Sequence, residues 1–171
     1  MNDLSAEALK ARLDSETRSR SAANMRPVDA ATLVLVDRRA RRPKVLMGKR
    51  SPNLKFMPGK FVFPGGRVDP EDRRMIAAGA LSPRAEMRLM KQTVRMTPQR
   101  CRALAMAAIR ETFEETGLMI GSADYGAPET APPGIWSEFA AQGLFPTPDA
   151  LTYVARAITP PRRPRRFDTR F

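Results

Sequence analysis

Alternating hydrophobic and polar residues mark several short strands along the chain. In DAATLVLVDRR, apolar and β-branched residues alternate over positions 31–36, and the stretch KVLMGKR follows after the basic segment RRARRP. This pattern predicts two antiparallel strands joined by that segment, and the core begins there. Downstream, the sequence predicts a turn at 57–60, a short strand at 61–63 and a strand in LTYVARAITP that ends at Pro160.

Helical signals dominate the middle of the chain. Thr97 followed by Pro98 is typical of a helix start, with threonine as N-cap and proline at the first position, and Gly117 is typical of a helix end. The charged segment 73–96 predicts a helical excursion before this helix, and IWSEFAAQG predicts a short helix that ends at Gly143. Residues 1–26 are polar with a weak helical pattern, which predicts an N-terminal arm.

Three glutamates lie close together near the end of the best-specified helix. At about 100° per residue, Glu111, Glu114 and Glu115 project from one face, so their charges repel unless a divalent cation or Arg110 compensates. An isolated E-x-x-E-E is most often a solvated helix face. Here, however, the helix is apolar on two sides: the side that carries the glutamates also carries Leu104, Ala107 and Ala108, and the opposite side carries Ala105, Met106, Ile109 and Phe113. This favours a packed helix that carries a carboxylate clamp.

The composition narrows the chemistry that the chain can perform. Its 171 residues suffice for one globular domain, and 42% of them are hydrophobic. The chain contains no histidine, which excludes a Ser-His-Asp triad, a Cys-His pair and any histidine-ligated metal site. Cys101 is the single cysteine, and the expectation for it is a small buried residue. The remaining carboxylate cluster favours hard cations such as Mg²⁺ or Mn²⁺.

The charge pattern bears on location and partners. No apolar run approaches the roughly 18 residues of a membrane span, and the first 26 residues carry acids that targeting peptides avoid, so we expect a soluble cytoplasmic protein without a membrane partner. The formal net charge is +12, and RRARRP and PRRPRRF are arginine clusters. Clustered arginine binds phosphates, which leaves RNA binding open as an alternative, although only 6% of the residues are aromatic.

Two segments of the chain together resemble a known motif. FPGGRVDPED followed by IRETFEETGL resembles the Nudix box, G-x(5)-E-x(7)-R-E-U-x-E-E-x-G-U, where U is apolar. The matching positions are Gly66, Asp72 (or Glu71 if counting starts at Gly65), Arg110, Glu111, Glu114, Glu115 and Gly117, with Thr112 as a polar exception at the first U. The box is split, because 37 residues separate Asp72 from Arg110 where the motif has seven. This split box is similar to the one in a subgroup of the family that includes peroxisomal acyl-coenzyme A diphosphatases and their bacterial relatives.

The resemblance implies a fold and a domain organisation. It implies an α+β fold, a Nudix-type α/β/α sandwich with a mixed sheet, over residues 27–171, preceded by the arm 1–26. The helical insertion in the box would cover about 73–97, and a loop and short helix about 121–143. Family sequences continue beyond RRFDTRF, so the resemblance also predicts a truncated C-terminus, with strands and a helix missing. We therefore expect this chain alone to be unstable or inactive.

The resemblance also implies a metal-dependent hydrolase that cleaves the diphosphate bond of a nucleoside diphosphate-linked small molecule, with coenzyme A and acyl-coenzyme A as candidates. By position, Glu114, Glu115 and the carbonyl of Gly65 would hold Mg²⁺ or Mn²⁺. Glu111 would bind a further cation or orient the attacking water, and Arg110 would hold the glutamates in place. The side chains that would meet the substrate's phosphates are those of Arg67, Lys49 and Arg50.

Several alternatives stay open at this level. Each basic side chain near the cleft also fits a solvated surface charge. Trp136 and Phe139 fit either an aromatic wall for the substrate or the packing of their helix onto the core. A non-catalytic Nudix-fold module and a homodimer are further alternatives. The sequence does not select among coenzyme A esters, nucleotide sugars, dinucleotides and NADH.

Overall fold

A four-stranded mixed sheet forms the centre of the fold. The computed structural model describes residues 23–53, 59–91, 93, 95–163 and 165–171. The strand order is β6 (Gly65–Arg67), β1 (Val28–Thr32), β10 (Phe167–Arg170) and β9 (Arg156–Ile158). β1 pairs in parallel with β10 and antiparallel with β6, while β10 and β9 are antiparallel. This mixed sheet confirms the predicted α+β class.

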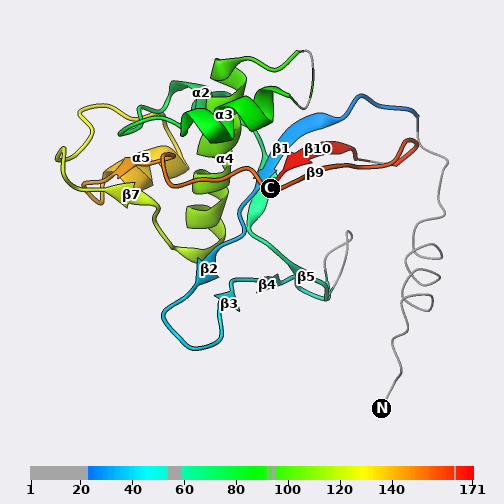
Figure 1. Ribbon diagram of the computed structural model, residues 1–171, viewed down its shortest axis with the longest axis horizontal. Coiled ribbons are helices and arrows are strands. Elements are labelled where there is room, and N and C mark those ends of the chain that lie inside the picture. Colours follow the sequence, from blue (N-terminus) through cyan, green and yellow to red (C-terminus); the bar gives the residue numbers. More distant parts are fainter. Residues whose placement is uncertain (1–22, 54–58, 92, 94, 164) are drawn as a thin grey trace.

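Helix α4 (Pro98–Thr116) packs on β1 and β6, and the other helices pack on α4 (Figure 1). Its ends are those that the sequence predicts. The Thr97 hydroxyl accepts a hydrogen bond from the Arg100 N–H at 3.2 Å, and Gly117 ends the helix in the left-handed conformation with φ 72°. The helices around it are α2 (Pro70–Arg74), α3 (Pro83–Met90) and α5 (Ile135–Ala140).

Helix α4 separates two hydrophobic clusters, as its two apolar sides predict. One side contributes Cys101, Leu104, Ala107 and Ala108 to a cluster that includes Ala31 of β1 and Leu89 of α3. The other side contributes Met106 and Ile109 to a cluster that includes Met75, Trp136 and Phe139. Trp136 and Phe139 thus take the packing role that the sequence left open, and Cys101 is buried as expected.

Two short strand pairs project from this body (Figure 1). β2 (Val36–Asp37) pairs antiparallel with β3 (Lys44–Val45), and β4 (Gly48–Lys49) pairs antiparallel with β5 (Phe61–Val62). The predicted antiparallel pairing around RRARRP is therefore confirmed, but each of the two predicted strands is wrong in extent, because both are divided. The division arises where the chain changes its partner: Leu33 donates its N–H to Pro64, whereas Leu35 accepts from the N–H of Leu46.

Other expectations from the sequence need correction or lie outside the described residues. The Pro-Gly-Gly segment favours a loop by its composition, but Gly65–Arg67 is strand β6, paired with β1. The strand expected in LTYVARAITP is limited to Arg156–Ile158, and the inner strand β10 begins at Phe167. Residues 121–143 hold β7 (Gly121–Ser122), which pairs with β8 (Phe145–Pro146), as well as α5. The arm up to residue 22 and part of the 57–60 turn lie outside the described residues.

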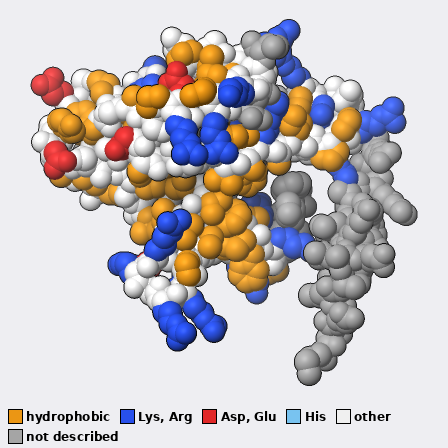
Figure 2. All heavy atoms as spheres, viewed as in Figure 1, with side chains coloured by type: hydrophobic (Ala, Val, Ile, Leu, Met, Phe, Trp, Pro, Cys, Tyr) orange, Lys and Arg blue, Asp and Glu red, His pale blue; other side chains and the backbone are white. Residues whose placement is uncertain are grey.

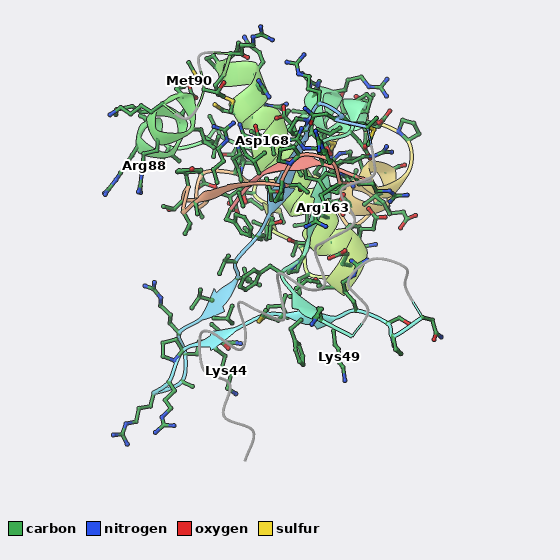
Figure 3. All side chains as sticks on the ribbon, turned by 90° about the vertical axis from the view of Figure 1, so that its right-hand side faces the viewer. Lys44, Lys49, Arg88, Met90, Arg163 and Asp168 are labelled. Atoms are coloured by element: carbon green, nitrogen blue, oxygen red, sulfur yellow. The ribbon has the colours of Figure 1, made fainter. Side chains whose placement is uncertain are left out.

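Partly buried ion pairs join the sheet to the start of α4. Arg100 donates hydrogen bonds from Nε and Nη2 to the Asp29 carboxylate at 2.5 and 2.6 Å. Arg156 donates hydrogen bonds from Nε and Nη2 to the Asp168 carboxylate at 2.7 and 2.8 Å, and Arg170 forms an ion pair with Asp168 at 2.8 Å. Asp168 lies in the upper, packed part of the molecule in Figure 3. These pairs fix the register of β1, β9 and β10 by charge as well as by backbone bonds.

The Asp168 carboxylate predicts a pH-dependent stability. Burial alone would raise its pKa, but the hydrogen bonds from Arg156 and the charge of Arg170 outweigh it and hold the pKa below its usual value. A carboxyl whose folded-state pKa is depressed stabilises the fold above its unfolded pKa, about 3.9, and loses that contribution as the pH falls through the folded value. We expect Asp168→Asn to be less stable than the parent at pH 7, with the difference shrinking below about pH 4.

Urea denaturation across pH 3–7 measures this difference. Asp149→Asn is the matched control, because Asp149 is an exposed aspartate outside the ion-pair layer and its replacement removes the same charge. A stability gap between Asp168→Asn and the parent that stays constant across the whole pH range would contradict the prediction.

No helix in the part of the chain that the structure describes is long and apolar enough to cross a membrane.

Candidate active site

The last two turns of α4 lie against β6, and the absence of a side chain at Gly66 makes this contact close. A Cβ atom added at Gly66 would overlap the carboxyl group of Glu111. The Glu111 side chain is 14% exposed, so its carboxylate sits between the helix and the strand. Strand β6 therefore supplies a glycine where the sequence motif has one because the glutamate needs that space.

Arg110 connects the glutamates to the rest of the fold. Its side chain is 6% exposed, and its Nη1 contacts Glu111 at 2.9 Å and Glu114 at 3.1 Å. Nη2 donates to the backbone carbonyl of Arg67 at 2.9 Å, which joins the helix to the end of β6. Burial lowers the pKa of the guanidinium, but Asp72 and Glu111 outweigh it and raise the pKa above its usual value. Arg110 is thus a permanent cation that holds two of the three glutamates.

Asp72 of helix α2 binds the guanidinium group of Arg110. It has no exposed surface, and its Oδ1 accepts from Arg110 Nε at 2.8 Å and from the Trp136 indole at 2.9 Å. Its Oδ2 accepts from Arg110 Nη2 at 3.1 Å and from the Asp69 N–H at 2.8 Å. The four acceptor positions of an ionised carboxylate are therefore filled.

The geometry also distinguishes Glu71 from Asp72, the two candidates for the acid in the first half of the motif. Glu71 makes a surface ion pair with Arg74 at 2.7 Å, whereas Asp72 meets Arg110. The two halves of the split box are therefore in contact although Asp72 and Arg110 are 38 positions apart. Sequence reasoning missed the indole of Trp136 in this cluster, because no local pattern relates α5 to α2.

Glu115 faces the backbone of Gly65. The Gly65 N–H donates to Glu115 Oε2 at 3.3 Å. The bonds Leu33 N–H to Pro64 and Val68 N–H to Asp29 mark alternate positions of the β1–β6 ladder. This alternation turns the N–H and carbonyl of Gly65 away from β1, so the ladder leaves that carbonyl unused.

The carboxylates at this site sit in a partly dehydrated, negative environment. Burial raises the pKa of Glu111, and the pairing with Arg110 opposes this shift. Burial likewise raises the pKa of Glu115, against the hydrogen bond from Gly65 and the charge of Arg50. Because burial disfavours the charged forms of Glu111 and Glu115, a bound cation would stabilise these two carboxylates.

The three basic residues that were expected to contact the substrate's phosphates differ in their positions relative to the glutamates. Arg50 is close enough for its charge to act on Glu115. Arg67 adjoins Gly66, but its exposed side chain pairs with Asp69 at 2.9 Å. Lys49 is on the projecting strand β4, and its side chain points outward (Figure 3). The structure therefore brings Arg50 to the glutamates and does not do so for the side chain of Lys49.

Comparisons with known proteins found several similar chains. No family model matches the chain. The acyl-coenzyme A diphosphatase NUDT19 of Xenopus laevis is 32% identical over 45% of this chain and 25% of that protein. The uncharacterized Nudix hydrolase NudL of Citrobacter koseri is 40% identical over 38% of this chain and 33% of that protein. The crystal structure of a NUDIX hydrolase from Alicyclobacillus acidocaldarius aligns at a TM-score of 0.61 and 30% identity, over 86% of this chain and 68% of that one.

The chain belongs to the Nudix hydrolase family. Its match spans only a quarter to a third of the length of the NUDT19 and NudL proteins. The motif residues lie together: Arg110 contacts Asp72, Glu111 and Glu114. Gly66 lies against Glu111, and Glu115 faces the neighbouring Gly65. The polar exception Thr112 also has a local explanation, because this fully buried hydroxyl donates to the carbonyl of Ala108 at 2.7 Å. A threonine can therefore replace an apolar residue of the Nudix motif here without leaving a buried hydroxyl unbonded.

The donor set of this Nudix site suits a hard cation in its chemistry. It offers three carboxylates on one helix face and an unused backbone carbonyl at Gly65, all oxygen ligands. Over residues 23–53, 59–91, 93, 95–163 and 165–171, no group of three acidic or cysteine side chains is gathered into a ready-made cation site. The reason is visible in the contacts: Arg110 holds Glu111 and Glu114, and Gly65 holds Glu115. Binding would require these carboxylates to exchange their present partners for the cation.

Proposed function

We propose that residues 27–171 form a Nudix domain that hydrolyses the diphosphate bond of a nucleoside diphosphate-linked small molecule with Mg²⁺ or Mn²⁺. The observation that carries this proposal is the contact between the two halves of the split box, Asp72 with Arg110 and Arg110 with Glu111 and Glu114. The 37 residues between Asp72 and Arg110, 30 more than the motif has, would separate its two halves if the fold did not bring them together. Helix α3 (Pro83–Met90) lies within the proposed helical insertion at about 73–97.

The proposed roles follow from the positions of the side chains. Glu114, Glu115 and the carbonyl of Gly65 would hold the cation, which supplies positive charge to the phosphoryl oxygens and lowers the pKa of water. Glu111, shielded against Gly66, would bind a further cation or orient the attacking water. Arg110 is a positioning residue, since it reaches the glutamates and is itself fixed by Asp72. In the reaction, water adds to one phosphorus and the bridging P–O bond breaks.

Coenzyme A or acyl-coenzyme A is the substrate that we propose to test first. Support comes from the relative NUDT19, whose name states an acyl-coenzyme A diphosphatase activity. Arg50, close to Glu115, is the cation best placed to meet a phosphate beside the glutamates. Arg67 would have to leave Asp69 to do so, and Lys49 would act only on parts of a substrate that extend toward the projecting strands.

Replacing Glu114 with glutamine tests the proposed function. We expect the hydrolysis rate with Mg²⁺ or Mn²⁺ to fall at least about tenfold, because a charged cation ligand becomes a neutral one. The assay follows product release from coenzyme A, acyl-coenzyme A, a nucleotide sugar, a dinucleotide and NADH. Glu138→Gln, which removes the same charge from an exposed position on α5, is the control. Equal rates for Glu114→Gln and Glu138→Gln would end the proposed role of Glu114.

One feature favours nucleic acid as a second partner. Arg38, Arg41 and Arg42 are exposed in the segment that joins β2 to β3. Figure 2 shows Lys and Arg side chains at the outer end of this projecting part. RNA binding that weakens steeply with salt and is unchanged in Glu114→Gln would assign this role, and Mg²⁺ binding without turnover would assign a non-catalytic module.

A further inference from the structure

Helix α5 contributes a hydrogen-bond donor to the cluster around Arg110, the indole nitrogen of Trp136. Trp136 is 1% exposed, and its Nε1 donates to Asp72 Oδ1 at 2.9 Å. Arg110 Nε donates to the same oxygen at 2.8 Å. Residues from α5 and α4 thus meet at one carboxylate oxygen of α2, and the Nudix motif accounts for Asp72 and Arg110 but not for the indole.

The Asp72 carboxylate determines where the guanidinium group of Arg110 points. Arg110 donates from Nε and Nη2 to Asp72, and Nη2 also donates to the backbone carbonyl of Arg67 at 2.9 Å. A guanidinium group is rigid and planar, so fixing these two nitrogens also fixes the third, Nη1. Nη1 contacts Glu111 and Glu114. If the two glutamates turn to a cation, Arg110 gives up the contacts of Nη1 and keeps those of Nε and Nη2.

Two donors outside Arg110 hold the Asp72 carboxylate itself. The Asp69 N–H donates to Oδ2 at 2.8 Å, and the indole of Trp136 donates to Oδ1. Because these donors bind different oxygens, together they fix the rotation of the carboxylate. Without the indole, Oδ1 would keep the bond from Arg110 Nε alone, and the carboxylate would follow the guanidinium group instead of holding it in place.

Aromatic contacts in turn fix the indole on α4. Helix α5 packs beside α4 (Figure 1). Trp136 lies edge to face with Phe139 at 5.5 Å between ring centroids, and Phe139 lies edge to face with Phe113 at 5.3 Å. Phe113 directly precedes Glu114 on α4. The ring that holds Asp72 is therefore seated on the same part of the helix that carries the glutamates.

We propose that Trp136 is a positioning residue for cation binding at Glu111 and Glu114. Its indole N–H keeps the Asp72 carboxylate in the orientation that retains Nε and Nη2 of Arg110 when the glutamates exchange Nη1 for a cation. A guanidinium group released from Asp72 would stay with the glutamates and compete with the cation. This inference rests on the proposed function, because it concerns the cation of that site, and it assigns a role to a residue outside the Nudix motif.

Mn²⁺ binding, followed by paramagnetic resonance, tests this role without requiring turnover. The chain holds a single tryptophan, so incorporating β-(3-benzothienyl)alanine in place of tryptophan replaces the N–H of this one ring by sulfur and keeps the shape of the ring. We expect the dissociation constant of Mn²⁺ to rise about tenfold, as it does when a group that orients metal ligands is removed. Trp136→Phe should show the same rise.

Phe139→Leu is the matched control, because it weakens the packing of the same helix without removing the indole N–H. Both Trp136→Phe and Phe139→Leu should lower the urea midpoint of unfolding, but Phe139→Leu should keep the Mn²⁺ affinity of the parent. If Mn²⁺ binds the benzothienyl protein as tightly as the parent, or more tightly, the indole has no positioning role, although the cation site stands. Equal weakening in Phe139→Leu would assign the effect to packing and equally overturn the proposal. A parent chain that does not bind Mn²⁺ would refute the cation site itself, and this role with it.

Discussion

Asp72→Asn is expected to lower the free energy of unfolding by about 3–5 kcal/mol. The carboxylate has no exposed surface and receives four donors, two from Arg110, one from the Trp136 indole and one from the Asp69 N–H. Asparagine would turn an NH₂ group toward donors and leave the buried Arg110 without its closest counter-charge. Because Asp72 joins α2, α4 and α5, its loss should weaken all three contacts at once.

The neighbouring residue provides a matched control. Glu71→Gln removes the same charge one position earlier on α2, but Glu71 pairs with Arg74 at the surface and should contribute less than about 1 kcal/mol. Urea denaturation, followed by the fluorescence of Trp136, measures both variants against the parent. If the two variants unfold at the same urea concentration, the buried cluster does not have the stabilising role that its geometry indicates.

Local signals in the sequence were sufficient to predict α4. Thr97 and Gly117 mark its ends through contacts within four residues, and its two apolar sides follow from helical spacing alone. The same spacing placed Glu111, Glu114 and Glu115 on one face. Each of these predictions depends on residues close together in the chain, where the physical rules are simple.

The sheet could not be predicted in this way, because its pairings join distant segments. β1 pairs with β6 and β10, so the first strand of the core is completed by residues from the middle and the last part of the chain. Nothing in PGGR marks it as a strand, since two glycines and a proline favour a loop. Gly66 is in a strand because β1 and Glu111 approach it from two sides, which is a tertiary effect.

The candidate site illustrates the same limit. The motif identified Arg110 and the glutamates but left the choice between Glu71 and Asp72 open, and it offered no hint of Trp136. Burial decides both points: Asp72 lies in the interior where Arg110 needs a counter-charge, and the indole of Trp136 reaches the same oxygen. The segment between α2 and α4 separates Asp72 from Arg110 in the sequence, but the fold brings the two side chains together.

Gly66→Ala is expected to lower kcat/KM for the proposed diphosphate hydrolysis by about 100-fold, because the added methyl group would push the Glu111 carboxylate from its place against β6. The control is Gly48→Ala in β4, where an added Cβ has no neighbour closer than 4.0 Å. Both are strand glycines, so a general cost of replacing glycine affects both alike. Circular dichroism of each variant checks that the fold is retained.

Steady-state kinetics measures the effect on turnover, and paramagnetic resonance of Mn²⁺ measures cation affinity without requiring turnover. If Glu111 binds or orients groups at the reacting phosphate, Gly66→Ala loses turnover, cation affinity or both, while Gly48→Ala keeps them. Unchanged turnover and Mn²⁺ affinity in a folded Gly66→Ala variant would show that the contact between Glu111 and Gly66 packs the helix on the sheet and does not position a catalytic group. The comparison therefore separates the two roles that one buried glutamate can have in this site.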